Sequence, residues 1–344
     1  MSDNLSSRTL IVGAGLAGTL MAWEFEKRGV PFEVWDSGAP SASKVAAGMY
    51  NPVSFKRLVE VWNATTNMEV MNKTYGELQE FLGIKALHPT PIMRIFPNQQ
   101  YRDLWQRRYD TGHDVAKWIG PAHLPEDAPE GVIAPHGFGV VNDSGWVDVS
   151  LLIGSMRSFL EKDGRFHVKR WDFSTDQQFD TIIDCRGVGA QADLATQGLK
   201  LAADHGEVLT LKSINLVTDG KILNRVKWLL PIAPETFKLG ATYEWNVVES
   251  KPTEEGKKVL LDTIFPILSE DLFEGFDIIN HESGFRPASH DRRPYVGPLT
   301  DHLGVFALNG LGTRGVLVGP AVARQLADYR LDNVPMQKEI QTYR

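Results

Sequence analysis

Cysteine is nearly missing from this chain, which contains Cys185 alone. A single cysteine excludes an internal disulfide and a cysteine-based metal cluster, and no metal site is predicted. Long apolar runs are missing as well, since none approaches the roughly 20 residues of a membrane-spanning helix. Positive charge is not in excess: the formal net charge is −7, which provides no basic surface for nucleic acid. Residues 1–4 are polar, unlike a secretory signal, so we expect a cytoplasmic protein.

The composition is that of an ordinary globular protein, with 42% hydrophobic and 23% charged residues. A chain of 344 residues predicts two domains, or one large domain with an insertion. We find no internal repeat and no low-complexity tract.

The most informative segment is residues 9–18, where a short apolar run leads into Gly-x-Gly-x-x-Gly and a helical pattern follows. This order predicts a buried parallel strand, a tight turn and a helix whose N-terminus binds a pyrophosphate. Gly13 permits the turn, Gly15 lets backbone N–H groups approach phosphate, and Gly18 lets the helix pack closely on the strand. A second apolar run, residues 32–35, ends at Asp36. A carboxylate there suits free ribose hydroxyls, which favours FAD or NAD over NADP.

The rest of the chain reads as alternating helices and strands. Residues 37–52 are rich in small residues and predict a loop, either at the surface or against a ligand. Helices are predicted at 57–82, 101–109, 149–160 (capped by Asp148 or Ser150) and from a cap at Thr253 toward residue 268. Strands are predicted at 92–96, 181–185, 208–211, 228–231 and 237–242. The proline-rich run around residues 121–129 suggests a peripheral insertion.

Two more glycine-rich turns follow apolar strands. Gly187 and Gly189 come directly after the strand at 181–185, and residues 309–315 separate a strand at 305–308 from a final helix ending near residue 329. Each turn could place backbone against a cofactor, or serve packing alone. Between 206 and 280 the runs alternate as in an antiparallel sheet with one helix.

Taken together, these segments resemble the D-amino-acid oxidase superfamily of FAD-dependent oxidoreductases. The resemblance covers residues 13–18 with Asp36, 46–52, 185–190, 228–231, 240–242, 284–297 and 310–315. It does not extend to residues 56–139. The implied fold class is α/β: a Rossmann-like FAD-binding domain with a second, mostly antiparallel β-sheet substrate domain. The implied FAD-binding domain comprises 1–85, 140–204 and 284–344, and the substrate domain comprises 86–139 and 205–283.

The resemblance also implies the residues that bind FAD without a covalent bond. They are Gly13, Gly15, Leu16, Ala17, Gly18, Asp36, Ala47, Gly48, Asn51, Gly187, Gly189, Gly312, Thr313, Arg314 and Gly315. The turn at 312–315 would face the flavin pyrimidine edge, where a helix N-terminus favours an anionic reduced flavin.

For the substrate, the resemblance implies Arg286, Arg314, Trp228 and Tyr243. Arg286 would pair with a substrate carboxylate through its planar fork, or else have a structural role. Trp228 and Tyr243 would shape the pocket, although aromatic residues on strands are often core residues. No catalytic base is identified, since a neutral amine whose Cα–H faces flavin N5 can lose hydride directly.

The implied function is FAD-dependent oxidation of the C–N bond of an amino acid or N-substituted amine by hydride transfer to flavin N5. Dioxygen or another carrier would reoxidise the flavin. Three alternatives stay open: a flavin-dependent monooxygenase, oxidation of a modified nucleoside in RNA, and a non-catalytic flavin-binding module. The net charge of −7 disfavours an RNA substrate.

Overall fold

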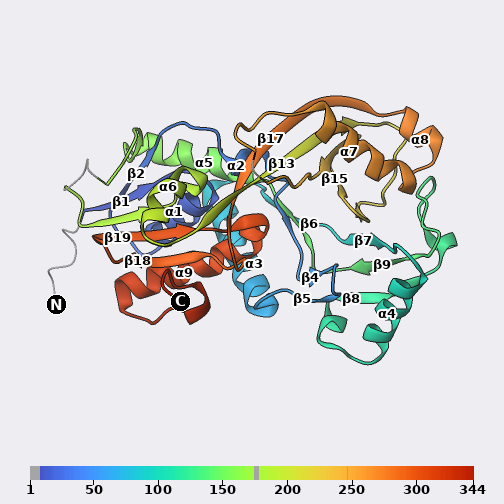
Figure 1. Ribbon diagram of the computed structural model, residues 1–344, viewed down its shortest axis with the longest axis horizontal. Helices are drawn as coiled ribbons and strands as arrows, with labels where there is room; N and C mark the ends of the chain where they lie inside the picture. Colours follow the sequence, from blue (N-terminus) through green and yellow to red (C-terminus); the bar gives the residue numbers. More distant parts are fainter. Residues whose placement is uncertain (1–7, 174–177, 246) are drawn as a thin grey trace.

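The computed structural model describes residues 8–344, apart from 174–177 and 246. The polar start at residues 1–4 lies outside the described residues. Two large sheets organise the molecule, one in each half of the view in Figure 1. No helix among the described residues has the length and apolar character to cross a bilayer.

The first sheet has six strands in the order β11-β2-β1-β12-β19-β18. Its neighbours pair in parallel except β18, which runs antiparallel to β19. The strands are β1 (Thr9–Val12), β2 (Phe32–Asp36), β11 (Phe166–Val168), β12 (Thr181–Asp184), β18 (Tyr295–Leu299) and β19 (His302–Asn309). Because parallel strands all end at one edge, the turns after β1, β12 and β19 meet there.

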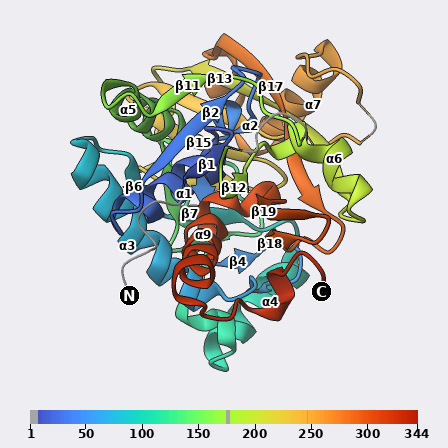
Figure 2. The ribbon, with the colours of Figure 1, turned by 90° about the vertical axis from the view of Figure 1, so that its left-hand side faces the viewer.

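Both faces of this sheet are covered. Ile11 joins a core with four helices: α1 (Leu16–Glu26), α3 (Ala64–Leu82), α5 (Val149–Lys162) and α9 (Gly315–Asp332). Leu10 and Val12 point the other way, into a core with α6 (Gln191–Thr196). Figure 2 shows α6 apart from α1 and α9. Burial on both faces explains why β1 is a continuous apolar run.

The second sheet has eight strands in the order β17-β13-β16-β15-β14-β7-β9-β8. All pairs are antiparallel except β14 with β7. The strands are β7 (Ile92–Ile95), β8 (Ile119–His123), β9 (Phe138–Val141), β13 (Leu201–Lys212), β14 (Ile222–Asn224), β15 (Trp228–Ala233), β16 (Thr236–Gly240) and β17 (Asp277–Ser289). Helix α7 (Glu254–Ile264) packs on it through Leu260 and Ile264.

Shorter elements complete the fold. They are β3 (Met49–Tyr50), β10 (Gly145–Val147) and β6 (Leu87–Pro89) in one small sheet, β4 (Val53–Ser54) with β5 (Val59–Glu60), and helices α2 (Ala42–Val45), α4 (Gln99–Asp110) and α8 (Glu270–Glu274). Single 3₁₀ turns occur at Asp114–Lys117, Pro125–Asp127, Gly187–Ala190, Phe265–Ile267, Gly312–Arg314 and Lys338–Ile340.

Several expected elements differ from the structure. The helix expected at 57–82 begins at Ala64, because Asn63 takes a left-handed conformation with φ 49°. The helix expected to reach residue 268 ends at Ile264, just before Pro266. The region around 101–129 contributes β8, the edge strand of the larger sheet, and Trp105 in it is fully buried.

Helix caps at two expected positions are confirmed. Asp148 accepts a hydrogen bond from Leu151 N at 2.9 Å, and Thr253 Oγ1 accepts one from Gly256 N at 2.9 Å. Each side chain satisfies an N–H group that the first helical turn leaves unpaired.

The strands β13 and β17 pair over their whole length, from Leu201 with Ser289 to Lys212 with Asp277. They connect the eight-stranded sheet with the edge of the parallel sheet (Figure 1). The domain boundary expected between residues 283 and 284 falls inside β17. The division into domains remains a prediction.

Candidate functional site

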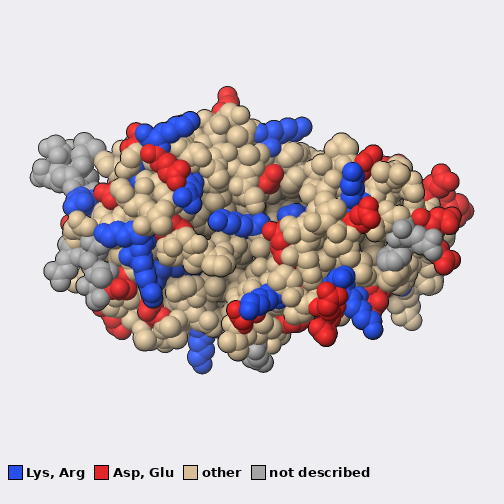
Figure 3. Space-filling view, turned by 90° about the horizontal axis from the view of Figure 1, so that it is seen from above, with Lys and Arg blue, Asp and Glu red and all other residues tan. Residues whose placement is uncertain are grey.

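A cavity of about 740 Å³ lies where the two sheets meet, at the carboxyl edge of the parallel strands. Viewed from above, the surface is hollowed near its middle, where basic side chains gather (Figure 3). Predicted site residues that line the cavity are Gly13, Gly15, Leu16, Ala17, Asp36, Ala47, Gly48, Gly187, Gly189, Trp228, Tyr243, Arg286, Gly312, Thr313 and Gly315.

The first glycine turn leaves no room for side chains. Gly13 has φ +95°, and a Cβ on it would lie 2.7 Å from the backbone oxygen of Cys185. A Cβ on Gly18 would lie 1.8 Å from Gly13 O, which is the close helix–strand packing expected there. The turn therefore exposes backbone N–H groups at the start of α1, which is a site suited to a pyrophosphate.

Asp36 ends β2 beside this turn. Its Oδ2 accepts a hydrogen bond from Ala14 N at 2.7 Å, and its Oδ1 accepts one from Gly38 N at 2.8 Å. Each carboxylate oxygen has a second lone pair. The side chain can thus fix the glycine turn and still accept a bond from a ribose hydroxyl in the cavity.

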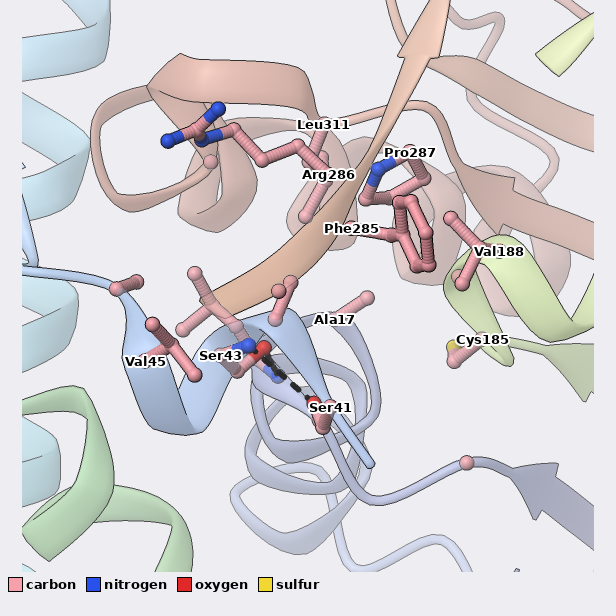
Figure 4. Close-up of a pocket in the computed structure, with 18 of the residues that line it drawn as sticks. Ala17, Ser41, Ser43, Val45, Cys185, Val188, Phe285, Arg286, Pro287 and Leu311 are labelled. Carbon is pink, nitrogen blue, oxygen red and sulfur yellow. Dashed lines mark hydrogen bonds between the residues drawn. The ribbon is translucent and has the colours of Figure 1, made fainter. Parts of the chain in front are cut away.

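Two serines that the sequence analysis did not identify lie over the start of α1 (Figure 4). Ser43 Oγ accepts a hydrogen bond from Leu16 N at 3.1 Å, and Ser41 Oγ accepts one from Ser43 N at 3.3 Å. A Cβ on Gly15 would come within 3.3 Å of both hydroxyls. Ser41 before the short helix α2 is an N-cap signal, but its position over α1 depends on the tertiary fold.

The second glycine turn is held by an ion-pair network. Asp184 is fully buried and binds Arg186 through both oxygens, at 2.9 Å and 2.8 Å. Arg186 also contacts Asp193 at 2.8 Å, and Asn309 Nδ2 donates to Gly187 O at 3.0 Å. The turn after β12 is therefore tied to the end of β19, and the glycines at 187 and 189 face the cavity.

Cys185 also lines the cavity, and its side chain is buried. Burial raises the pKa of the thiol well above its ordinary value, and the charge of Asp184 raises it further. Because the thiolate is the nucleophilic form, this cysteine is a poor group for covalent attachment.

The third turn lies at the start of α9. Gly312 has φ +56°, and the N–H groups of the first turn of α9 point out of the helix toward its N-terminal end. Gly312, Thr313 and Gly315 all line the cavity. The partial positive charge of this helix end favours an anion there.

Arg286 lies on β17 at the opposite wall of the cavity, and Figure 4 shows its side chain extending away from Phe285. Its Nη1 is 3.3 Å from Asp204 Oδ2 and 3.4 Å from Thr242 O, both long contacts. Its guanidinium also lies 4.7 Å from the ring centroid of Tyr243. Among the described residues, Nε and Nη2 have no hydrogen-bond partner, so these donors are available to a ligand.

Asp204 is a buried neighbour of this arginine that the sequence analysis did not identify. It is 3% exposed, and its Oδ1 has no hydrogen-bond partner among the described residues. Burial raises the pKa of the carboxyl group, while the positive charge of Arg286 acts in the opposite direction. An isolated acidic residue on a strand does not indicate an ion pair with Arg286, because that pair depends on the register of β13 with β17.

Two aromatic residues complete this end of the cavity. The ring of Trp228 lies against Gly240, where a Cβ would come within 2.6 Å of it. Tyr243 is half exposed, and its ring also makes a cation–π contact with Lys227, whose Nζ is 5.2 Å from the ring centroid. Both residues line the cavity.

Three predicted residues do not line the cavity. Gly18 acts through packing. Asn51 forms a local turn, since its Nδ2 donates to Val53 O and its Oδ1 accepts from Val53 N, each at 2.9 Å. Arg314 is exposed at the start of α9, and its pKa is lowered by partial loss of hydration and by the like charges of Arg292 and Arg293. Ligand contact by these three residues stays a prediction.

Comparison with known proteins agrees with this geometry. The family model described as FAD dependent oxidoreductase matches residues 8–329. The chain is 22% identical to glycine oxidase of Pseudomonas aeruginosa, covering 96% of this chain and 97% of that protein. It is 25% identical to the tRNA 5-methylaminomethyl-2-thiouridine biosynthesis bifunctional protein of Marinobacter nauticus, covering 95% of this chain and 57% of that one.

The fold is also found in solved structures. Iminodiacetate oxidase from a Chelativorans species superimposes with a TM-score of 0.81 at 22% identity, over 97% of this chain and 99% of that chain. Glycine oxidase from Geobacillus kaustophilus superimposes with a TM-score of 0.77 at 18% identity, over 94% of each chain. The chain spans about half the length of the bifunctional relatives that it matches.

The match over nearly the whole chain, together with three glycine turns around one cavity, identifies this protein as a member of the FAD-dependent oxidoreductase family, and FAD is its cofactor.

Proposed function

We propose that this enzyme oxidises the C–N bond of an amino acid or N-substituted amine that carries a carboxylate. The observation that carries the proposal is Arg286, which presents free guanidinium donors to the same cavity that the glycine turns line. Structural neighbours named glycine oxidase and iminodiacetate oxidase support this substrate class.

The chain provides three contacts for FAD, two from backbone turns and one from a carboxylate. The turn at Gly13 and Gly15 would hold the pyrophosphate, Asp36 the adenosine ribose, and the start of α9 the flavin pyrimidine edge. The chemistry that FAD supplies when bound is acceptance of a hydride at N5. The residues of this chain then contribute position and electrostatics.

Arg286 would bind the substrate carboxylate with its uncommitted Nε and Nη2 donors. Such charge-assisted, two-point pairs are shorter and stronger than neutral hydrogen bonds. The long contacts with Asp204 and Thr242 O keep the guanidinium in place without consuming these donors. Trp228 and Tyr243 would exclude water beside the bound amine, which strengthens the ion pair.

Anaerobic reduction of the bound flavin, followed at 450 nm, tests this proposal. Amino acids, N-alkyl amino acids and the matching amines without a carboxylate would be compared. We expect bleaching by a carboxylate-bearing amine, and none by NAD(P)H alone. Rapid reduction by NAD(P)H without an amine would favour a monooxygenase, and no reduction by any amine would contradict the proposal.

The Arg286→Gln variant tests the carboxylate contact. Hydrogen bonds to charged groups contribute about 1.5–3 kcal/mol, so the substrate concentration for half-reduction should rise at least about tenfold. The visible spectrum of bound FAD should stay unchanged. Arg324→Gln is the matched control, because Arg324 is exposed on α9 and, among the residues that the structure describes, pairs only with Asp328, at 3.7 Å. Unchanged affinity in Arg286→Gln would remove the assigned role.

A second candidate is a modified nucleoside in tRNA, favoured by the match to the bifunctional tRNA-modification proteins. The net charge of −7 opposes it, because nucleic-acid binding depends on neutralising phosphates with basic residues. Bleaching by tRNA bearing an N-alkylated nucleoside, with no response to free amino acids, would select this candidate.

A further inference from the structure

A mostly buried polar cluster lies on β13 and on the segment after β16, beside the cavity. His205, Glu207 and Glu244 each offer a ligand atom, and the three atoms lie within 4.8 Å of one another. His205 and Glu207 are on β13, and Glu244 is on the segment that follows β16 and bridges to His205 through two backbone hydrogen bonds of 2.9 Å. Helix α7 lies over the same part of β13 (Figure 1).

The imidazole of His205 is the unusual member. It is 1% exposed, and neither ring nitrogen has a hydrogen-bond partner among the described residues. Its Nδ1 is 3.9 Å from Glu244 Oε2, too far for a hydrogen bond. Leaving a buried polar group unsatisfied costs about 1–3 kcal/mol, so a native structure is expected to supply a partner.

The two carboxylates differ in how firmly they are held. Glu207 is fully buried and accepts hydrogen bonds from Thr253 N (3.0 Å), Thr253 Oγ1 (2.8 Å) and His281 Nε2 (2.7 Å). Such bonds orient a ligating carboxylate and are typical of the surroundings of metal ligands. The Glu244 side chain is 42% exposed, which gives an ion a route from solvent.

We propose that His205, Glu207 and Glu244 bind one divalent transition-metal ion, of which Zn²⁺ is the best match. One imidazole and two carboxylates are a ligand set that zinc accepts, with the fourth position open to water. Calcium requires six to eight oxygen ligands and is not suited to this set. Zinc bonds of about 2.0–2.1 Å place tetrahedral ligand atoms roughly 3.3 Å apart. Since the three atoms now lie within 4.8 Å of one another, closure requires them to approach by up to about 1.5 Å, and the partly exposed Glu244 side chain has the most freedom to move.

The ion would connect β13 with the segment that follows β16, and both carry residues at the Arg286 end of the cavity. His205 follows Asp204, the partner of Arg286, and Glu244 follows Tyr243, which lines the cavity. A metal bound there would hold the β13 backbone and the Tyr243 segment together behind the cavity wall. The site is separate from the FAD contacts, and its occupancy does not depend on the proposed reaction.

Isothermal titration calorimetry of the FAD-loaded protein, treated with EDTA and dialysed, tests the site. We expect one Zn²⁺ to bind per chain, and no saturable binding of Ca²⁺. Glu244→Gln should weaken Zn²⁺ binding at least about tenfold, since loss even of an outer-shell partner costs 10- to 100-fold. Because Glu244 is exposed, this variant should fold even if His205→Asn does not.

The matched control is His167→Asn, which alters an exposed histidine 3.4 Å from Glu33 Oε2. It should leave Zn²⁺ affinity unchanged. Zn²⁺ should also slow hydrogen exchange of the Thr242 and Glu244 amides, which donate to Glu207 O and His205 O. Absence of saturable Zn²⁺ binding, or equal affinity in Glu244→Gln, would overturn the proposal.

Discussion

Replacing Gly206 with alanine should displace Arg286 without changing its chemistry. A Cβ on Gly206 would lie 2.0 Å from Nη2 and 2.4 Å from both Cζ and Nη1 of Arg286. Cβ atoms essentially never approach non-bonded heavy atoms closer than 3.0 Å, so Nη2 must move by at least 3.0 − 2.0 = 1.0 Å. The guanidinium is the end of a flexible side chain, and we therefore expect it, rather than the strand, to move.

The size of the effect follows from the geometry of the ion pair. A two-point pair is directional, and a shift of this size removes most of its charge-assisted bonding. At about 1.5–3 kcal/mol for a hydrogen bond to a charged group, kcat/KM for a carboxylate-bearing amine should fall about 10- to 150-fold. The matching amine without a carboxylate should react as in the wild type.

The assay is anaerobic flavin reduction at several substrate concentrations, with the 450 nm spectrum as a measure of bound FAD. Gly76→Ala is the matched control: Gly76 is inside α3, and a Cβ there would meet nothing within 4 Å. That variant should be stabilised by about 0.5–1 kcal/mol with unchanged kinetics. Wild-type kinetics in Gly206→Ala with the carboxylate substrate would refute the reasoning.

Two further predictions concern the cofactor turn and acid stability. In Gly18→Ala the new Cβ would lie 1.8 Å from Gly13 O. Because backbone must move to relieve this contact, the affinity for FAD should fall and the free energy of unfolding should decrease by about 1–3 kcal/mol or more. An FAD titration identical to that of the wild type would contradict this prediction. Burial raises the pKa of Asp291, but bonds from Arg344 and from the Arg293 N–H outweigh it and hold the pKa below its ordinary 3.8. Its stabilising contribution is therefore present above pH 3.8 and is lost as pH falls through the folded-state pKa. Because this ion pair is near the surface, Asp291→Asn should lower the free energy of unfolding in urea by about 0.5–1 kcal/mol at pH 7. The difference from the wild type should become progressively smaller below pH 3.8. A difference that does not change with pH would exclude this explanation.

The glycine turns could be predicted from sequence because their determinants are local. An apolar strand followed by glycines and a helix imposes one geometry, and parallel strands bring such turns to a common edge. Gly13, Gly187 and Gly312 were predicted in this way, and all three line the cavity.

The remaining site residues could not be predicted because they depend on strand register and on long-range placement. Ser43 lies over α1 only once α2 is packed there, and Asp204 meets Arg286 only through the pairing of β13 with β17. Asn51 uses its amide in a local Asx turn, and its place near the flavin stays a prediction. His205 and Glu207 are two residues apart on one strand, but nothing in their spacing predicts that Glu244, on a different segment, lies next to them.

The continuity of β17 has a consequence for how the molecule unfolds. Its 13 residues, at about 3.3 Å each, reach from the outer end of the larger sheet to the cofactor cavity. A break within this strand would leave unpaired backbone edges on both sides, which invite aggregation. Neither half is therefore expected to persist as a separate folded fragment, and loss of one should be accompanied by loss of the other in a single cooperative transition.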